Sequence, residues 1–150
     1  MNIQLRKSTL ADMKAVHALV KQLAEFERAP EEVITTSELY EADLSANHFE
    51  AIVAEDIDLE ENKIIGMALY YFAYSTWKGR YIWLEDFIVT ENYRGKGVGK
   101  MLFEEIINIT KQYKTILKWQ VLDWNEPAIN FYKKYDAEFL DGWRTCKLTP

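Results

Sequence analysis

The chain has 150 residues, of which 49% are hydrophobic and 28% are charged, and its formal net charge is -6. This size and composition predict one globular domain over residues 1–150 and exclude a disordered chain. No apolar run approaches the roughly 20 residues of a membrane-spanning helix. The acidic balance argues against nucleic acid as a partner and favours the attraction of cations. The N-terminus has no apolar signal segment, so we expect a cytoplasmic location.

The residues that usually bind metals or form disulfides are few. The chain has one cysteine, Cys146, and two histidines, His17 and His48, which lie in different predicted elements. A single cysteine cannot form an intramolecular disulfide, and the histidines do not have the spacing of metal ligands. We therefore expect no metal site. A covalent enzyme intermediate is not expected either, because no histidine lies near Cys146 in the sequence.

The first half of the chain begins with a short strand and a helix. Thr9 is followed three residues later by Asp12, which is typical of a helix start, and Pro30 ends the helix. The expected elements are a strand at 3–6, a helix from Thr9 to Glu25 or Phe26, a short helix at 36–44, and strands at 49–54 and 63–74. The two strands form a hairpin around the polar loop 55–62.

The second half contains three glycines between a strand and a helix. In chain order, the expected elements are a strand at 81–89, a helix that begins at the glycines and ends near 114, a strand at 115–122, a helix capped by Asn125, and two short strands near 137–139 and 144–148. The last two strands are expected to form a terminal hairpin.

The glycines Gly95, Gly97 and Gly99 lie where a helix is expected to begin. Glycine allows a tight turn and a close approach to a ligand, and the first N–H groups of a helix attract phosphate. Two nucleotide-binding patterns fail. The pattern G-x-x-x-x-G-K-[ST] is broken by Met101, and G-x-G-x-x-G is broken by Lys100. The loop therefore predicts a phosphate-binding site outside the common nucleotide folds.

The pattern Arg94-x-x-Gly97-x-Gly99 after an apolar strand resembles the acyl-CoA loop of the GNAT acetyltransferase superfamily. Other segments resemble its diamine (spermidine/spermine) N-acetyltransferase branch: Leu84-Glu85-Asp86-Phe87, Asn125-Glu126-Pro127, Phe131-Tyr132 and Gly142-Trp143-Arg144. The resemblance implies an α+β GNAT fold, with helices on a mixed, mostly antiparallel sheet. It also implies acetyl-CoA as cofactor, direct transfer of the acetyl group to the amine of a small molecule in a ternary complex, and a homodimer with the terminal hairpin as interface.

The resemblance also implies which residues form the site. Expected cofactor-binding residues are Phe87, Ile88, Val89, Arg94, Gly95, Lys96, Gly97, Val98, Gly99, Lys100, Asn125 and Tyr132. The backbone of residues 87–89 is expected to pair with pantetheine as an added strand does, which requires this strand to separate from the next one. Expected substrate-binding residues are Phe26, Glu27, Trp77, Glu85 and Trp119.

Acetyl transfer to an amine requires a base for the ammonium and an acid for the leaving thiol. Adjacent residues in a regular strand point to opposite faces, so only one of Glu85 and Asp86 is expected to face the cleft. The resemblance implies that Glu85 is the base, acting through water, and that Tyr132 is the acid. From the residues alone, both carboxylates could equally be structural, and a tyrosine on an apolar helix face is more often part of a core.

Two residues depart from the resemblance. Ser75 stands where polyamine-specific members are acidic, and Asp136 stands where a glycine commonly follows the helix. The loss of an acid near Ser75 leads us to expect a short diamine, a thialysine-like amino acid or another primary amine rather than a long polyamine. Two alternatives stay open: a non-catalytic acyl-CoA-binding regulatory module, and an acetyltransferase that acts on a protein or peptide.

Overall fold

The computed structural model describes every residue except Asn62, so the last position of the polar loop 55–62 lies outside the described residues. The chain divides into two compact units, Met1–Gln120 and Val121–Pro150. The described helices are all too short or too polar to cross a membrane.

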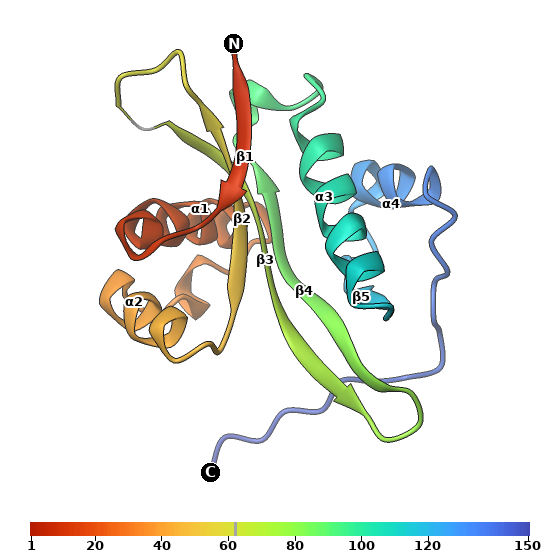
Figure 1. Ribbon diagram of the computed structural model, residues 1–150. Coiled ribbons are helices and arrows are strands. Elements are labelled where there is room, and N and C mark those ends of the chain that lie inside the picture. Colours follow the sequence, from red (N-terminus) through yellow and green to blue (C-terminus); the bar gives the residue numbers. More distant parts are fainter. Residues whose placement is uncertain (62) are drawn as a thin grey trace. The chain divides into compact units, whose positions relative to one another are not determined.

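The first unit contains one sheet of five strands in the order β1-β2-β3-β4-β5 (Figure 1). The strands are β1 (Ile3–Lys7), β2 (Glu50–Asp56), β3 (Ile64–Ser75), β4 (Gly79–Val89) and β5 (Leu117–Trp119). Neighbours from β1 to β4 are antiparallel, whereas β5 runs parallel to β4. A parallel neighbour needs a crossover, and helix α3 (Val98–Gln112) provides it. The expected mixed, mostly antiparallel sheet is confirmed.

Helix α1 (Met13–Phe26) packs on one face of this sheet, and α2 (Ser37–Ser45) lies beside α1 (Figure 1). The helix begins as predicted: after a 3-10 turn at Leu10–Asp12, the Asp12 carboxylate accepts the Thr9 N–H at 2.7 Å. One face of α1 is buried against alternate residues of the strands. The shared core comprises Met13, Val16, Leu19, Ala51, Val53, Met67, Leu69 and Ile88.

Helix α3 covers the opposite face of the sheet (Figure 1). Its apolar residues recur at helical spacing, and Leu102, Phe103 and Ile106 are almost completely buried. Their burial fixes the rotation of the helix about its axis. Because the glycine loop leads directly into this helix, the same packing fixes where the loop lies.

The second unit contains α4 (Glu126–Lys133), which Asn125 caps as predicted: its Oδ1 accepts the Ala128 N–H at 3.3 Å. The prediction of two closing strands, at 137–139 and 144–148, was wrong. Residues 137–150 are all described and contain no helix or strand, and every side chain from 138 onward is exposed. An isolated two-stranded hairpin is marginal in water, so the alternation of these residues does not suffice to form strands in a single chain.

Candidate active site

The register between β3 and β4 changes at the expected catalytic acids. Leu69 lies opposite Asp86, but the next residue of β3, Tyr70, lies opposite Leu84. Glu85 is therefore an extra residue on β4, which defines a β-bulge. Bulges occur beside active sites because they redirect side chains.

The residues on either side of the bulge show which face of the sheet each part of β4 presents. Before the bulge, Ile82 lies opposite Phe72, whose ring packs on Tyr113 at the end of α3, with centroids 4.8 Å apart. After it, the ring of Phe87 packs on Phe103 of α3 at 5.7 Å. The α3 face thus receives even-numbered residues before the bulge and odd-numbered residues after it.

Glu85 and Asp86 consequently point to the same face, which is the one covered by α1. The prediction that only one of them faces the cleft was wrong, because it assumed an unbroken strand. Leu69, opposite Asp86, and Ile88, two residues further along β4, belong to the core beneath α1 and confirm this orientation. The bulge therefore converts two consecutive acids into a pair on one side of the sheet.

Two donors hold the exposed carboxylate of Glu85. Its Oε2 accepts a hydrogen bond from the indole Nε1 of Trp83 at 2.7 Å and another from the hydroxyl of Tyr71 at 3.3 Å. Trp83 and Tyr71 are directly opposite each other on β4 and β3. Both donors therefore belong to rigid strands, and the position of the carboxylate is defined by the sheet itself.

Asp86 is more deeply placed than Glu85. Burial, followed by the negative charges of Glu85 and Glu27, raises the pKa of Asp86 to about 6. Glu27 follows directly after α1, and burial raises its pKa as well. Tyr40 of α2 also lies near this group: burial raises the pKa of the tyrosine, and the charge of Asp86 adds a smaller effect in the same direction. The site thus gathers three acids from β4 and the end of α1.

The glycine loop and the start of α3 have the geometry of an anion site. Gly95 and Gly97 have φ of 71° and 87°, and a Cβ added at either would meet no atom within 4 Å. No described side chain caps α3, in contrast to α2 and α4. The first N–H groups of α3, beginning with Val98, therefore have no described side-chain cap. Lys96 and Lys100 extend from the loop, with Lys96 over the ring of Tyr93 and Lys100 near Glu104.

After the bulge, the backbone N–H and C=O groups of alternate residues of β4 point away from β3. The Thr90 N–H donates to the Ile65 carbonyl at 2.9 Å, and Val89 lies opposite Gly66. Antiparallel pairs alternate, so the backbone groups of Phe87 and Val89 point toward the β5 side, whereas those of Ile88 bond to β3. Pairing of β4 with β5 ends at Leu84 and Trp119. This is the expected separation of the two strands.

Arg94 folds back onto the sheet. Its Nε donates to the Val89 carbonyl at 2.9 Å, and its guanidinium lies 5.5 Å from the ring centroid of Phe26. Phe26, which was expected to contact the substrate, thus supports the glycine loop from the end of α1. The hydroxyl of Tyr93 donates to the buried Asp56 at 2.8 Å and anchors the segment before the loop.

Two expected substrate-binding residues lie apart from the carboxylates. Trp77, whose side chain is 89% exposed, is in the turn between β3 and β4, six strand positions or more from Glu85. The ring of Trp119 packs on Phe103 of α3, with centroids 5.4 Å apart, and so lies on the other face of the sheet. Ser75 stabilises the β3–β4 turn, because its Oγ accepts the N–H groups of Trp77 and Lys78 at 3.3 Å.

The second unit carries the expected acid. Tyr132 is buried on α4, its ring contacts Phe131 at 5.5 Å, and burial raises the pKa of its phenol to about 12. The hydroxyl therefore remains protonated at neutral pH and can donate a proton. Asp136 has φ of 55°, which explains why glycine suits this position and why aspartate is tolerated there.

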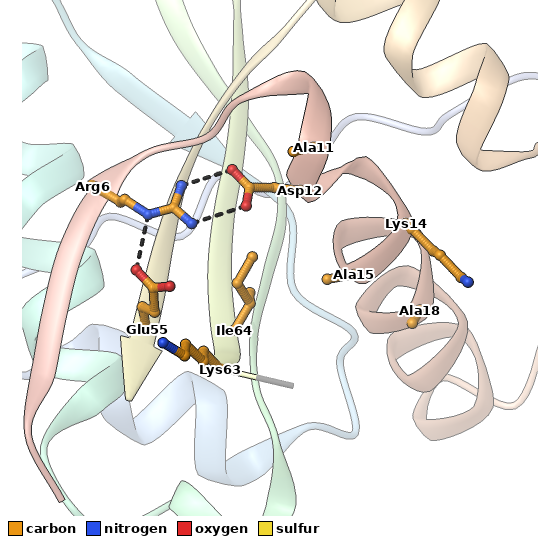
Figure 2. A pocket seen from close by; sticks show the side chains of 9 residues that line it. All are labelled: Arg6, Ala11, Asp12, Lys14, Ala15, Ala18, Glu55, Lys63 and Ile64. Carbon is orange, nitrogen blue, oxygen red and sulfur yellow. Dashed lines mark hydrogen bonds and ion pairs between the residues drawn. The ribbon is translucent and has the colours of Figure 1, made fainter. Parts of the chain in front are cut away.

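A cavity of about 470 Å³ lies elsewhere in the first unit, and none of the expected site residues lines it (Figure 2). It is bounded by β1, the end of β2, the start of β3, the 3-10 turn at Leu10–Asp12 and the first half of α1. Figure 2 shows Arg6 between Asp12 and Glu55, and the guanidinium pairs with these carboxylates at 2.7 and 3.0 Å. These paired charges join β1 to β2 and to the start of α1, which is a structural role. Asn62 aside, no group of three or more His, Cys, Asp or Glu side chains is placed to hold a metal ion.

Sequence reasoning missed two residues of this site. Asp86 was considered as the base but set below Glu85, whereas Trp83 and Tyr71 were not considered as partners of the acids. The two donors could have been found only from the strand register, because Tyr71 is fourteen residues from Glu85 in the chain. The aromatic residue two positions before Glu85 was the available signal.

Comparison with known proteins agrees with this geometry. Residues 16–136 match the Acetyltransferase (GNAT) family, a match that extends over parts of both units. The chain is 33% identical to the thialysine N-epsilon-acetyltransferase of Mus musculus, over 93% of this chain and 88% of that protein. It is 32% identical to the spermidine/spermine N(1)-acetyltransferase-like protein 1 of Homo sapiens, over 93% of this chain but 21% of that longer protein.

Solved structures show the same fold. An aminoglycoside acetyltransferase from an uncultured soil metagenomic sample superimposes with a TM-score of 0.79 at 20% identity, covering 98% of this chain and 97% of that one. Given the glycine loop before α3, the bulged strand that carries two acids, and a family match over most of its length, this chain belongs to the GNAT acetyltransferase family.

Proposed function

We propose that this protein transfers an acetyl group from acetyl-CoA to the primary amine of a small molecule, by direct attack of the amine in a ternary complex. The observation that carries the proposal is the bulge of β4, which presents Glu85 and Asp86 together beside the strand edge that leads to the glycine loop. Relatives named for thialysine and for spermidine and spermine acetylation support a small amine as substrate.

The residues of the loop fit acetyl-CoA. Open space around Gly95 and Gly97 and an uncapped α3 suit a pyrophosphate bound by backbone N–H groups from Gly95 to Lys100. Phe87 and Val89 direct backbone groups toward the side where pantetheine would lie. Ile88, between them, bonds to β3 and so holds this part of β4 in position. Bound there, acetyl-CoA supplies an activated acetyl thioester. Arg94 adds positive charge and braces the loop against β4 and Phe26.

The acids of the site can attract the substrate as an ammonium ion and accept a proton from it. Glu27, Glu85 and Asp86 concentrate negative charge on the α1 face of β4, which attracts an alkylammonium ion. An ammonium with an ordinary pKa of about 10.4 must lose a proton before it can attack a carbonyl, and a nearby carboxylate is the group to receive it. The nitrogen loses two protons in becoming an amide: one passes to the carboxylates and the other is released as the amide forms.

The thiol side of the reaction is assigned to the second unit. We propose that Tyr132 gives its phenolic proton to the departing sulfur, so that the thiol leaves protonated, and that Asn125 contacts pantetheine while it caps α4. The position of both residues in the family motif supports these roles. The family match across both units supports the further proposal that residues 1–150 act as one catalytic domain.

The substrate is proposed to be a short amine. Ser75 uses its hydroxyl to hold the β3–β4 turn, and it offers no charge to a distant second ammonium group. We therefore propose a short diamine or a thialysine-like amino acid, a substrate too short to reach from the carboxylates to Trp77 in the β3–β4 turn. The protein is proposed to act in the cytoplasm as a homodimer, with no nucleic acid or membrane partner, and the net charge of -6 is consistent with the preference for cations.

The test is acetyl-CoA binding by calorimetry, followed by thiol release with a panel of amines that includes thialysine, ornithine, short diamines and spermine. Gly97→Ala is expected to weaken acetyl-CoA binding about tenfold, because a residue other than glycine at φ of 87° is strained by roughly 1–2 kcal/mol and the free loop can relieve this strain by leaving the binding conformation. Gly79→Ala is the matched control, since its φ is 82°, its Cβ space is also open and it is the first residue of β4, after the β3–β4 turn.

The outcomes separate the candidate functions. Absence of any acetyl-CoA affinity in the wild-type protein contradicts the whole proposal. Binding without acetylation of any amine indicates a regulatory acyl-CoA-binding module. Acetylation of lysate proteins, detected by mass spectrometry, in place of small amines indicates a protein acetyltransferase. A preference for spermine over every short amine contradicts the role given to Ser75.

A further inference from the structure

The two acids at the bulge differ in their surroundings, although they share a face of the sheet. Glu85 is exposed, and both of its described donors, Trp83 Nε1 and Tyr71 Oη, converge on the same oxygen, Oε2. Two donors on one oxygen hold the carboxylate in a defined position. An exposed and oriented carboxylate is suited to binding an ammonium ion.

Asp86 has the opposite character. It is partly buried, it lies opposite Leu69, and the charges that face it are those of Glu85 on its own strand and Glu27 at the end of α1. Tyr40 of α2 lies near it as well. The charged groups of the described residues that act on it, Glu85 and Glu27, are negative, so this surrounding favours the uptake of a proton. A carboxyl group in such a place is a better proton acceptor than an exposed one.

We infer that the bulge divides the work between the two acids: Trp83 and Tyr71 are positioning residues that hold Glu85 to bind the substrate ammonium, and Asp86 accepts its proton. This assignment rests on the proposed function and replaces the expected base, Glu85. In the step, one N–H bond of the ammonium breaks and its electron pair stays on nitrogen. The proton forms an O–H bond on Asp86, which later releases it to solvent. The free amine can then attack the acetyl group.

The pH dependence of turnover tests the role of Asp86. In wild-type protein, kcat/KM is expected to rise with pH and to level off above about pH 6; this rise is the limb of the pH profile. It is expected because Asp86 must be ionised to accept the proton, and burial and its acidic neighbours raise its pKa to about 6. Asp86→Asn is expected to lower kcat by about 100-fold or more and to remove that limb. Asp86→Glu keeps a carboxylate and is expected to retain a limb and part of the activity.

Glu85→Gln provides the contrasting variant. It is expected to raise KM for the amine and to keep the limb, displaced to lower pH, because one negative neighbour of Asp86 is removed. Loss of the limb in Glu85→Gln together with its retention in Asp86→Asn overturns the assignment. Retention of the limb in both variants also overturns it, because neither acid would then be the acceptor.

The positioning role has its own test. Trp83→Phe keeps an aromatic ring but removes the donor at 2.7 Å, and it is expected to raise KM for the amine about tenfold and to lower kcat less. Tyr71→Phe removes the longer bond and should have a smaller effect in the same direction. Tyr74→Phe is the control, because it removes an exposed hydroxyl from the same strand. An unchanged amine KM in Trp83→Phe overturns the positioning role.

Two measurements distinguish failure of this inference from failure of the proposed function. Acetyl-CoA affinity, measured by calorimetry, should be unchanged in Trp83→Phe and Asp86→Asn, and thermal unfolding should show that both are folded. A wild-type protein that acetylates no amine overturns the function and this inference together. A wild-type protein that acetylates amines while Asp86→Asn keeps its pH limb overturns the inference alone.

Discussion

At the scale of one residue, burial of the ionised Asp86 carboxylate lowers the stability of the folded chain. Its carboxyl group has a pKa of about 6 in the folded chain, mainly because of burial and then because of Glu85 and Glu27. The unfolded chain has the ordinary value of about 3.9. The folded state therefore binds this proton more tightly, so the stability it provides is complete below pH 4 and is lost as pH rises toward 6.

Asp86→Asn should accordingly stabilise the protein at pH 8, by about 1–3 kcal/mol, because the amide carries no charge to bury. At pH 4 most of this gain should disappear. Urea unfolding at the two pH values measures the difference, and Asp141→Asn, which alters an exposed acid, serves as the control. An equal gain at both pH values would mean that burial of the charge is not the cause.

At the scale of elements, β3 and β4 depend on close contact at Gly66. A Cβ at this position would lie 2.9 Å from the Ile88 carbonyl oxygen and 3.2 Å from Cδ1 of Leu102 on α3. A backbone atom cannot move aside as a flexible side chain can. An added methyl group would therefore push β4 and α3 apart from β3 at the residues proposed to bind pantetheine.

Gly66→Ala should thus destabilise the protein by about 1–3 kcal/mol and also weaken acetyl-CoA binding. Unfolding in urea measures the first effect, and calorimetry on the folded variant measures the second. If stability falls while acetyl-CoA affinity is unchanged, the displacement does not reach Phe87 and Val89, and the proposed cofactor strand edge is misplaced.

Among the elements, the helix starts could be predicted from the sequence and the bulge of β4 could not. Local signals determine where helices begin, so Thr9, Asp12 and Asn125 placed two of them correctly. The bulge could not be predicted in this way, because it depends on which residue of β3 lies opposite each residue of β4. Without that register, Glu85 and Asp86 were assigned to opposite faces and Trp83 was not connected to either.

The closing segment shows the same limit for the chain as a whole. Alternation at 137–139 and 144–148 predicted strands, but a strand forms only where another strand or sheet receives it. In a single chain, residues 138–150 are exposed instead. Leu140, Trp143 and Leu148 have exposed fractions of 61%, 86% and 87%, which is unusual for side chains so apolar.

We therefore predict, at the scale of the whole molecule, that a second copy of the chain covers this segment in the proposed homodimer. Sedimentation of the full chain should give the mass of a dimer, and removal of residues 137–150 should give a monomer. Trp143→Ser with Leu148→Ser should weaken the dimer, because burial of apolar side chains is its expected driving force. Ile34→Ser is the control, since Ile34 is 89% exposed and lies outside this segment. A full chain that stays monomeric at high concentration would contradict the prediction, and the apolar side chains of the segment would then need another partner.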